Sequence, residues 1–269
     1  MKKEIIFLKL GGSLITDKAK PSTAREGRIQ QLAEEIAQFL NENPEIRLLL
    51  GHGSGSFGHV AAKKHGTRQG VDGEAGWRGF AEVWAQAANL NQLVVRALQK
   101  ASLPVLVFPP SASAWAKDGA ISNWDLRPVE KALAAGLLPL VYGDVAFDQE
   151  RGGTVLSTED LFVYLADKLR PQSILLAADE PVYAEYPARD KIIPEVTPRT
   201  FAGLSASMGA AGNKDVTGGM KSKVQRMLDV VETNPDCEVR IFDAKRKGEL
   251  LSALRGEESP GTRIKSDKA

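Results

Sequence analysis

Short apolar runs alternate along this chain with longer segments of helical periodicity. The apolar runs of strand length occupy residues 4–10, 46–50, 104–108, 137–142, 173–178 and 238–242. The segments with apolar residues at helical spacing occupy 25–43, 76–101, 125–135, 157–169, 220–232 and 247–254. Because the strand runs are apolar nearly throughout rather than alternating, we expect them to be buried on both faces. Strands that alternate with helices in this way predict an α/β sandwich around a mostly parallel sheet.

Two segments depart from this alternation. Residues 143–156 are predicted to form a β-hairpin that turns at 149–153. Residues 179–219 show little helical pattern and contain several prolines. That is long for a plain connection, and long loops within compact domains often carry function. No repeat, low-complexity tract or obvious linker interrupts the sequence, and we expect a single domain over residues 1–269.

The composition mainly excludes classes of function. Of the 269 residues, 43% are hydrophobic and 26% charged, as in ordinary soluble globular proteins. Lysine and arginine number 35 against 34 acidic residues, which argues against a broad nucleic-acid surface. The lone Cys237 cannot form an internal disulfide, which fits a reducing cytoplasm. We find neither an apolar run of about 18 residues nor a signal peptide, so we expect no membrane partner.

A glycine-rich stretch at residues 51–59, GHGSGSFGH, follows a strand run and precedes a helical one. Glycines let backbone N–H groups approach an anion, and a helix N-terminus adds partial positive charge. The stretch also contains the dinucleotide pattern Gly53-x-Gly55-x-x-Gly58, but residues 68–76 offer no second strand ending in an acidic residue. We therefore reject a nicotinamide or flavin cofactor and predict a phosphate-bearing ligand.

Two lysines accompany a second glycine turn near the start of the chain. Lys9 lies at the end of the first strand, next to Gly11, Gly12 and Ser13, whose backbone donors could form a nest for an anion. A tight turn with a surface lysine explains these residues equally well. Lys18 follows in the next loop, where a lone lysine is usually only solvated. Its interest comes from its closeness to the glycine turn.

A histidine and a carboxylate are further candidates for handling an anion. His59 is expected at the phosphate-facing end of a helix, although a lone histidine is usually structural. Asp160 follows Ser157 and Thr158 at a helix start, where capping alone would ordinarily explain the acidic residues. A phosphate site with several lysines, however, needs a carboxylate to space and orient them, and Asp160 is the candidate.

A third glycine element, DVTGGMKSK at residues 215–223, again leads a loop into a helix. Lys223 would lie in the first helical turn, where a cation opposes the helix dipole unless an anion compensates. The chain has no G-x-x-x-x-G-K-[ST] string and so is not a P-loop protein. The glycine and lysine elements together exceed what one phosphate needs. Because positioning and charge neutralisation dominate phosphoryl transfer, we infer a kinase of a small molecule.

These motifs resemble those of the amino acid kinase superfamily in matching order and over essentially the whole chain. The matching elements are residues 9–13, the helix start at Asp160, Asp179 after a strand, and Gly218-Gly219-Met220-x-x-Lys223. Within the superfamily, residues 53–59 together with 15–18 resemble the isopentenyl phosphate kinases. This resemblance is specific, because most other members of the superfamily lack a histidine at the position of His59.

The resemblance implies an open αβα sandwich, a homodimer, ATP with Mg²⁺ as phosphoryl donor, and isopentenyl phosphate as acceptor. The product would be isopentenyl diphosphate, formed by direct in-line transfer for terpenoid synthesis from the mevalonate pathway. An acceptor-binding lobe would span approximately residues 1–170, and a nucleotide-binding lobe 171–269. No side chain of the protein is assigned as a metal ligand.

The resemblance also carries a role to each matching residue. The catalytic set would be Lys9, Lys18, His59, Asp160 and Lys223, with Lys18 at the transferring phosphoryl group and Asp160 organising the lysines. ATP would contact Lys9, Gly11, Gly12, Ser13, Gly55, Asp179, Tyr183, Gly218, Gly219 and Lys223. The acceptor phosphate would contact Ser54, Gly55, His59 and Thr158. The family usually has Asp-x-x-Gly-x-Tyr at the nucleoside, whereas residues 179–183 read DEPVY, which leaves the nucleoside contacts open.

A prenyl tail needs an apolar pocket, and the helix with Phe80, Val83 and Trp84 is the candidate lining. Ordinary helix-to-sheet core explains each of these residues at least as well. Three rival functions remain. A phosphonate kinase of the fosfomycin type would share His59, whereas an amino-acid or carbamate kinase would not explain it. A non-catalytic nucleotide-binding sensor would not need three lysines and Asp160.

Overall fold

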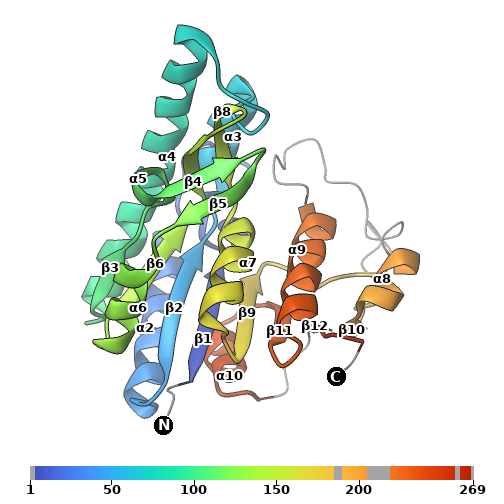
Figure 1. Ribbon diagram of the computed structural model, residues 1–269. Helices are drawn as coiled ribbons and strands as arrows, with labels where there is room; N and C mark the ends of the chain where they lie inside the picture. Colours follow the sequence, from blue (N-terminus) through green and yellow to red (C-terminus); the bar gives the residue numbers. More distant parts are fainter. Residues whose placement is uncertain (1–3, 185–189, 205–218, 258–260, 268–269) are drawn as a thin grey trace.

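The computed structural model describes residues 4–184, 190–204, 219–257 and 261–267. Its centre is an eight-stranded sheet in the order β10-β12-β11-β9-β1-β2-β6-β3 (Figure 1). All neighbouring strands are parallel except β11 and β12. The strands are β1 Ile5–Leu10, β2 Arg47–His52, β3 Val105–Val107, β6 Leu138–Tyr142, β9 Ser173–Ala178, β10 Glu195–Val196, β11 Glu238–Asp243 and β12 Gly261–Ile264. The mostly parallel sheet expected from the sequence is confirmed.

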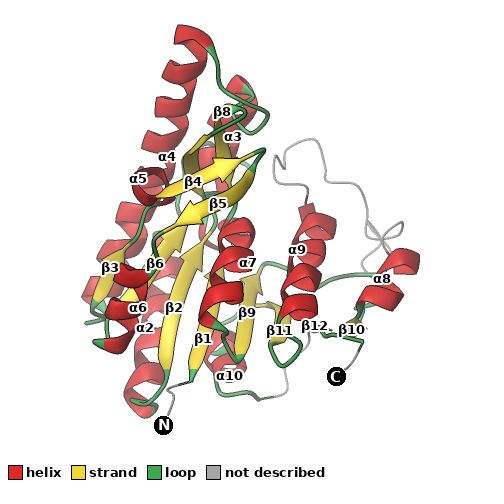
Figure 2. Ribbon diagram, in the orientation of Figure 1, coloured by secondary structure: helices red, strands yellow, loops and turns green. Residues whose placement is uncertain are grey.

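Helices cover both faces of this sheet (Figure 2). One face packs against α2 (Glu26–Glu42), α4 (Gly73–Lys100) and α10 (Glu249–Leu254). The other packs against α6 (Arg127–Ala134), α7 (Thr158–Leu169) and α9 (Gly219–Thr233). Because each strand is thus covered twice, its side chains are apolar on both sides, and the αβα sandwich follows from the sequence pattern.

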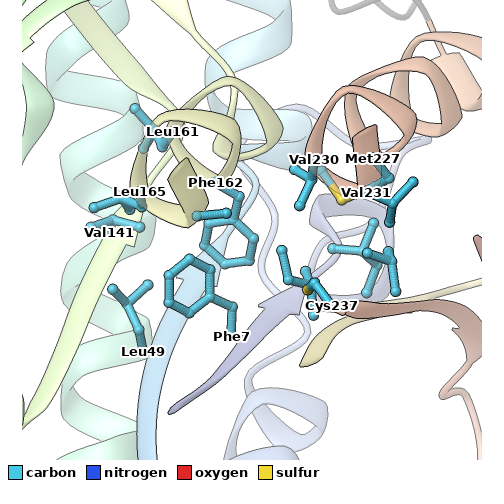
Figure 3. Close-up of a cluster of buried hydrophobic side chains, with 14 of the residues drawn as sticks. Phe7, Leu49, Val141, Leu161, Phe162, Leu165, Met227, Val230, Val231 and Cys237 are labelled. Carbon is cyan, nitrogen blue, oxygen red and sulfur yellow. The ribbon is translucent and has the colours of Figure 1, made fainter. Parts of the chain in front are cut away.

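The layer under α7 and α9 shows how this burial works. Figure 3 shows Phe162 and Leu165 of α7 lying over Phe7 and Leu49 of the central strands. The rings of Phe7 and Phe162 have their centroids 5.2 Å apart, and both side chains are fully buried. Cys237, which precedes β11, lies under α9 in the same layer, and burial raises the pKa of its thiol to about 12. Such a thiol is a packing residue rather than a nucleophile.

A second, smaller sheet lies beyond the carboxyl ends of the central strands, in the order β5-β4-β7-β8. The predicted hairpin is confirmed as the antiparallel pair β7 (Asp144–Asp148) and β8 (Gly152–Leu156). The second hairpin, β4 (Ala114–Lys117) with β5 (Ala120–Trp124), was not predicted from the sequence. These strands are short, and only every other residue of β4 is buried, so no continuous apolar run marks them.

The long segment 179–219 holds more structure than predicted where it is described. It contains the edge strand β10 and the helix α8, Pro198–Leu204. Proline at the first helical position is favourable because its missing N–H has no partner to lose there. Shorter helices α1 (Gly12–Ile15), α3 (Gly55–His65) and α5 (Pro110–Ser113) complete the described part. Among the described residues, no helix is both long and apolar enough to cross a membrane.

Glu35 on α2 holds α10 in place, which gives a first testable prediction. Its carboxylate is buried and accepts hydrogen bonds of 3.1 Å each from the backbone N–H groups of Gly248 and Leu251 at the start of α10. Replacing Glu35 with Ala leaves both donors unsatisfied, so we expect the free energy of unfolding in urea to fall by about 2 kcal/mol. The exposed neighbour Glu34 is the matched control, since Glu34→Ala removes only a surface contact to Gln30. Equal stability of the two variants would contradict this capping role.

Candidate active site

The carboxyl ends of the central strands come together at one edge of the sheet. Leu10 of β1 is in register with His52 of β2 and with Ala177 of β9, and His52 is in register with Tyr142 of β6. The first two glycine turns predicted from the sequence follow β1 and β2 directly. In open α/β sheets, ligands bind at this edge.

The two glycine turns pack directly against each other. A Cβ atom on Gly12 would lie 2.6 Å from the backbone nitrogen of Gly55, and one on Gly11 would lie 2.9 Å from the carbonyl oxygen of Ala177. Gly55 also has a φ of +50°, and its Cβ would lie 2.2 Å from Oγ1 of Thr16. That threonine hydroxyl accepts the backbone N–H of Ser56 at 3.0 Å, which fixes the start of α3. Side chains are thus excluded where the backbones of the two turns meet.

Gly55→Ala is expected to damage both the fold and the turn. The left-handed backbone and the clash with Thr16 should lower the free energy of unfolding by at least about 2 kcal/mol. Gly27→Ala is the control, because nothing lies within 4 Å of its Cβ position in α2, and alanine there should stabilise by about 0.5–1 kcal/mol. Urea denaturation of both variants measures the difference. A Gly55→Ala protein as stable as Gly27→Ala would show that this close approach is not required.

Lys9 and Glu159 form a buried ion pair at the centre of this edge. The ammonium of Lys9 contacts the carboxylate of Glu159, and each side chain is only 7% exposed. Burial alone would raise the pKa of Glu159, but the charges of Lys9 and Lys223 and the hydrogen bond from Lys9 outweigh it, so the pKa lies below its usual value. Glu159 therefore remains ionised between two lysines.

Asp179 is the second carboxylate of the site, and it contacts Ser13 and Lys18. Its carboxylate accepts a hydrogen bond from Oγ of Ser13 at 2.6 Å, and Nζ of Lys18 lies 3.3 Å from its second oxygen. Burial would raise its pKa, but Ser13, Lys18 and Lys223 together hold the pKa below its usual value. The charge of Lys223 lowers the pKa of both Asp179 and Glu159, so Lys223 lies near the two carboxylates that Lys18 and Lys9 contact.

The carboxylate predicted to organise the lysines needs a correction. Asp160 lies in a capping box with Ser157, and its two oxygens face Arg226 at 2.9 Å and Arg68 at 3.2 Å. The contact with Lys9 is made instead by Glu159, one residue earlier. In the first turn of a helix, consecutive side chains point in different directions, so the two acids cannot share one set of partners. A sequence signal was present, because both acids stand at the same helix start.

The predicted acceptor residues lie around the start of α3. Ser54 precedes α3, and its hydroxyl lies 2.5 Å from the Cβ position of Gly58. His59, half-buried, is on the second turn of α3. Thr158 is buried, and its hydroxyl donates to the carbonyl of His52 at 2.7 Å, which ties α7 to the end of β2. The hydroxyl of Thr158 is therefore already committed to the backbone.

The predicted apolar lining divides in two. Phe80 and Val83 are buried in a small cluster between helices α3 and α4 and the strands β7 and β8. The other members of that cluster are Ala61, Ala62, Val71, Val145 and Val155. Trp84 does not belong to it, since 47% of its surface is exposed. Phe80 and Val83 thus pack within this apolar cluster and Trp84 lies outside it, while their role as lining for a prenyl tail stays a prediction.

The residues predicted to contact the nucleotide after β9 and at the start of α9 are described in part. Gly219 begins α9 with a φ of +67°, while the predicted Gly218 lies outside the described residues. Tyr183 forms an isolated β-bridge with Ile192. Lys245, which was not predicted from the sequence, follows β11 and forms an ion pair with Asp243. The hydrogen bond to Asp243 is the main cause of its raised pKa, and the charges of Tyr183 and Asp179 raise it further. It adds a further cation to this edge.

Comparisons with known proteins agree on one family. The family model described as "Amino acid kinase family" matches residues 4–243. The isopentenyl phosphate kinase of Methanothermobacter thermautotrophicus is 34% identical over 272 residues, covering 97% of this chain and 98% of the relative. The one from Methanocaldococcus jannaschii is 30% identical over 263 residues, covering 94% and 96%.

A solved structure agrees with these relatives. The entire chain of an isopentenyl phosphate kinase crystal structure aligns with 97% of this chain at a TM-score of 0.82 and 30% identity. Matches of this identity over nearly the full length of both proteins involve the sheet, the glycine turns and the helices around them alike. The chain belongs to the amino acid kinase family, within its isopentenyl phosphate kinase branch.

Proposed function

We propose that this protein transfers the γ-phosphoryl group of ATP to isopentenyl phosphate, forming isopentenyl diphosphate and ADP. The observation that carries the proposal is the pairing of Lys9 with Glu159 and of Lys18 with Asp179, beside two glycine turns in contact, with the charge of Lys223 acting on both carboxylates. The names of the relatives and the matching family model support the same reaction. Such a cationic site suits two anionic substrates, here ATP as donor and isopentenyl phosphate as acceptor.

We assign the residues to the two substrates as follows. Gly11, Gly12 and Ser13 offer backbone and hydroxyl donors to the ATP phosphates, with Lys9 and Lys223 beside them. Lys18 stabilises the transferring phosphoryl group, because its side chain is 67% exposed and can move from Asp179 to a phosphate. Ser54, Gly55 and His59 bind the acceptor phosphate at the start of α3, where the helix dipole favours an anion. Glu159 takes the spacing role first assigned to Asp160, by holding Lys9 in place.

The reaction requires little covalent participation by the protein. The acceptor phosphate is already ionised at neutral pH, so its oxygen attacks the γ-phosphorus in line and ADP leaves without a phosphoenzyme. The main obstacle is repulsion between two phosphates. Lys9 is held in place by the buried carboxylate of Glu159 before substrates arrive, so it stabilises the transition state without reorganising.

Magnesium would enter with ATP. Within the part of the chain that the structure describes, no three metal-ligating side chains come together, and Glu159 and Asp179 are both engaged by lysines. Mg²⁺ keeps several waters and is commonly held by substrate phosphates, which fits a site of this kind. When bound, it would neutralise phosphate charge.

We also propose that the protein works as a homodimer in the cytoplasm and supplies terpenoid synthesis. The feature that supports self-association is an exposed aromatic patch formed by Trp77, Trp115 and Phe147, with ring centroids 5.9 and 6.0 Å apart around Phe147. Exposed apolar patches commonly mark interaction surfaces. Light scattering of the purified protein tests the dimer directly.

A substrate panel tests the proposed reaction. ATP and Mg²⁺ are supplied with isopentenyl, dimethylallyl or geranyl phosphate or with fosfomycin, and both ADP release and the phosphorus NMR signals of a diphosphate are measured. We expect the highest kcat/KM with isopentenyl phosphate. Preferred turnover of fosfomycin would instead identify a phosphonate kinase. Nucleotide binding without turnover of any acceptor would identify a sensor.

A further inference from the structure

Asp160 is the centre of an ion cluster that phosphate binding does not account for. Its oxygen Oδ2 accepts from Nη2 of Arg68 at 3.2 Å, and Oδ1 lies 2.9 Å from Nε of Arg226. The Asp160 side chain is 6% exposed, against 21% for Arg68 and 40% for Arg226. A buried carboxylate between two guanidinium groups makes charge-assisted contacts of well-defined direction.

The position of Asp160 is fixed independently of the arginines. The backbone N–H of Ser157 donates to Oδ2 at 2.9 Å, and the Ser157 hydroxyl accepts from the Asp160 N–H at 3.1 Å. This reciprocal pair is the capping box of α7. The carboxylate is therefore a fixed point to which two other elements attach.

The two arginines come from different elements around the candidate active site. Arg226 is on α9, one helical turn after Lys223, and their side chains point to similar sides of the helix. Arg68 lies in the turn after α3, the helix that carries His59. Arg68 also donates to the carbonyl of Val155 at 3.4 Å, and Val155 belongs to the apolar cluster with Phe80 and Val83. One arginine thus adjoins the proposed nucleotide residues, the other the proposed acceptor residues.

We propose that Asp160 is a positioning residue that aligns the two substrate-binding helices, holding α9 through Arg226 and the turn after α3 through Arg68. This inference rests on the proposed function for the identity of the two substrates. The Asp160–Arg226 contact sets the direction of Lys223 toward Glu159 and Asp179. The Asp160–Arg68 contact holds the end of α3 and β8 against α7. Asp160 then acts on phosphoryl transfer through these neighbours, without touching a substrate.

The Asp160–Arg226 contact and the Asp160–Arg68 contact predict separable defects. Arg226→Gln should weaken binding of Mg²⁺-ADP about 10-fold, as a misplaced Lys223 loses its phosphate contact, and should change the KM of isopentenyl phosphate less than about two-fold. Arg68→Gln should raise the acceptor KM about 10-fold and leave ADP binding within about two-fold. Asp160→Asn should show both defects. Calorimetric titration with Mg²⁺-ADP and steady-state kinetics measure the two quantities separately.

Matched controls come from the same helix. Arg226→Lys retains a cation opposite Asp160 and should recover most of the ADP affinity. Asp229→Asn removes the other carboxylate near Arg226, 3.5 Å from its Nη1, and should leave ADP affinity unchanged. A merely structural cluster would give equal losses of both ligands in both arginine variants, in step with the melting temperature, and that result would overturn the proposal. Unchanged ligand affinities in all variants would also overturn it.

Failure of the proposed function gives a different pattern. A wild-type protein that binds Mg²⁺-ADP but does not turn over isopentenyl phosphate would refute that function. The titrations would still test the contact between Asp160 and Arg226 on α9, because ADP binding requires no acceptor. Loss of ADP affinity in Arg226→Gln but not in Asp229→Asn would then support the Arg226 contact alone and overturn the two-substrate alignment.

Discussion

Replacing Lys9 with Met is expected to lower kcat by at least about 100-fold and the free energy of unfolding by about 3–5 kcal/mol. The two effects have separate causes. The ammonium of Lys9 is proposed to offset phosphate repulsion during transfer, and no other group occupies its place at the end of β1. The stability loss arises because Glu159 would remain charged and buried without its main partner. Steady-state kinetics and urea denaturation measure the two effects.

The Lys9→Met, Glu159→Gln double variant separates these effects. Removing both charges should restore most of the stability, since an unpaired buried charge costs more than a neutral pair. Activity should stay low, because the missing ammonium is not replaced. Recovery of activity together with stability would show that Lys9 serves only the fold.

The pH dependence of stability provides a second check on the same pair. In the wild type, the pKa of Glu159 lies below its usual value, so the pair stabilises the fold above the unfolded pKa and this contribution is lost as the pH falls. In Lys9→Met, burial becomes the dominant influence and should raise that pKa. The stability deficit of Lys9→Met should therefore shrink toward pH 4 and grow toward pH 7. A deficit that is independent of pH would contradict a charged Glu159.

Much of the central fold followed from the sequence because parallel strands covered on both faces leave an unmistakable pattern. The runs at 46–50 and 137–142 became β2 and β6 with shifts of one or two residues. The peripheral pieces were missed for physical reasons. Strands β4 and β5 are short and partly exposed, and β10 is a two-residue edge strand, so burial never forced a long apolar run.

The candidate site was predictable to the level of its motifs but not of its contacts. The glycine turns were found because close backbone approach leaves a compositional trace, as at Gly12 and Gly55. The partner of Lys9 was not, because Glu159 and Asp160 are chemically alike and adjacent. Only the direction of each side chain from α7 decides which acid meets a lysine and which meets the arginines. That direction is a property of the folded helix.

His59→Ala is expected to raise the KM of isopentenyl phosphate by about 10- to 100-fold while changing the KM of ATP less than about two-fold. Its position on the second turn of α3, beyond the contact of Gly53 and Gly55 with the first glycine turn, is the basis for its proposed role at the acceptor phosphate. A hydrogen bond to a charged phosphate is worth this much when its donor is removed. Kinetics with each substrate varied in turn measure the two constants.

The same helix supplies the control for His59. His65 lies at the other end of α3 and pairs with Glu82 at 2.7 Å, so His65→Ala should leave both KM values near those of the wild type. His59→Gln, which keeps a donor but no possible positive charge, should fall between the wild type and alanine if hydrogen bonding carries part of the effect. Equal rises in the KM of ATP and of isopentenyl phosphate in His59→Ala would mean that the histidine supports the glycine turns generally. A rise in the KM of isopentenyl phosphate alone, with the KM of ATP unchanged, would leave direct contact between His59 and the acceptor phosphate as the physical explanation.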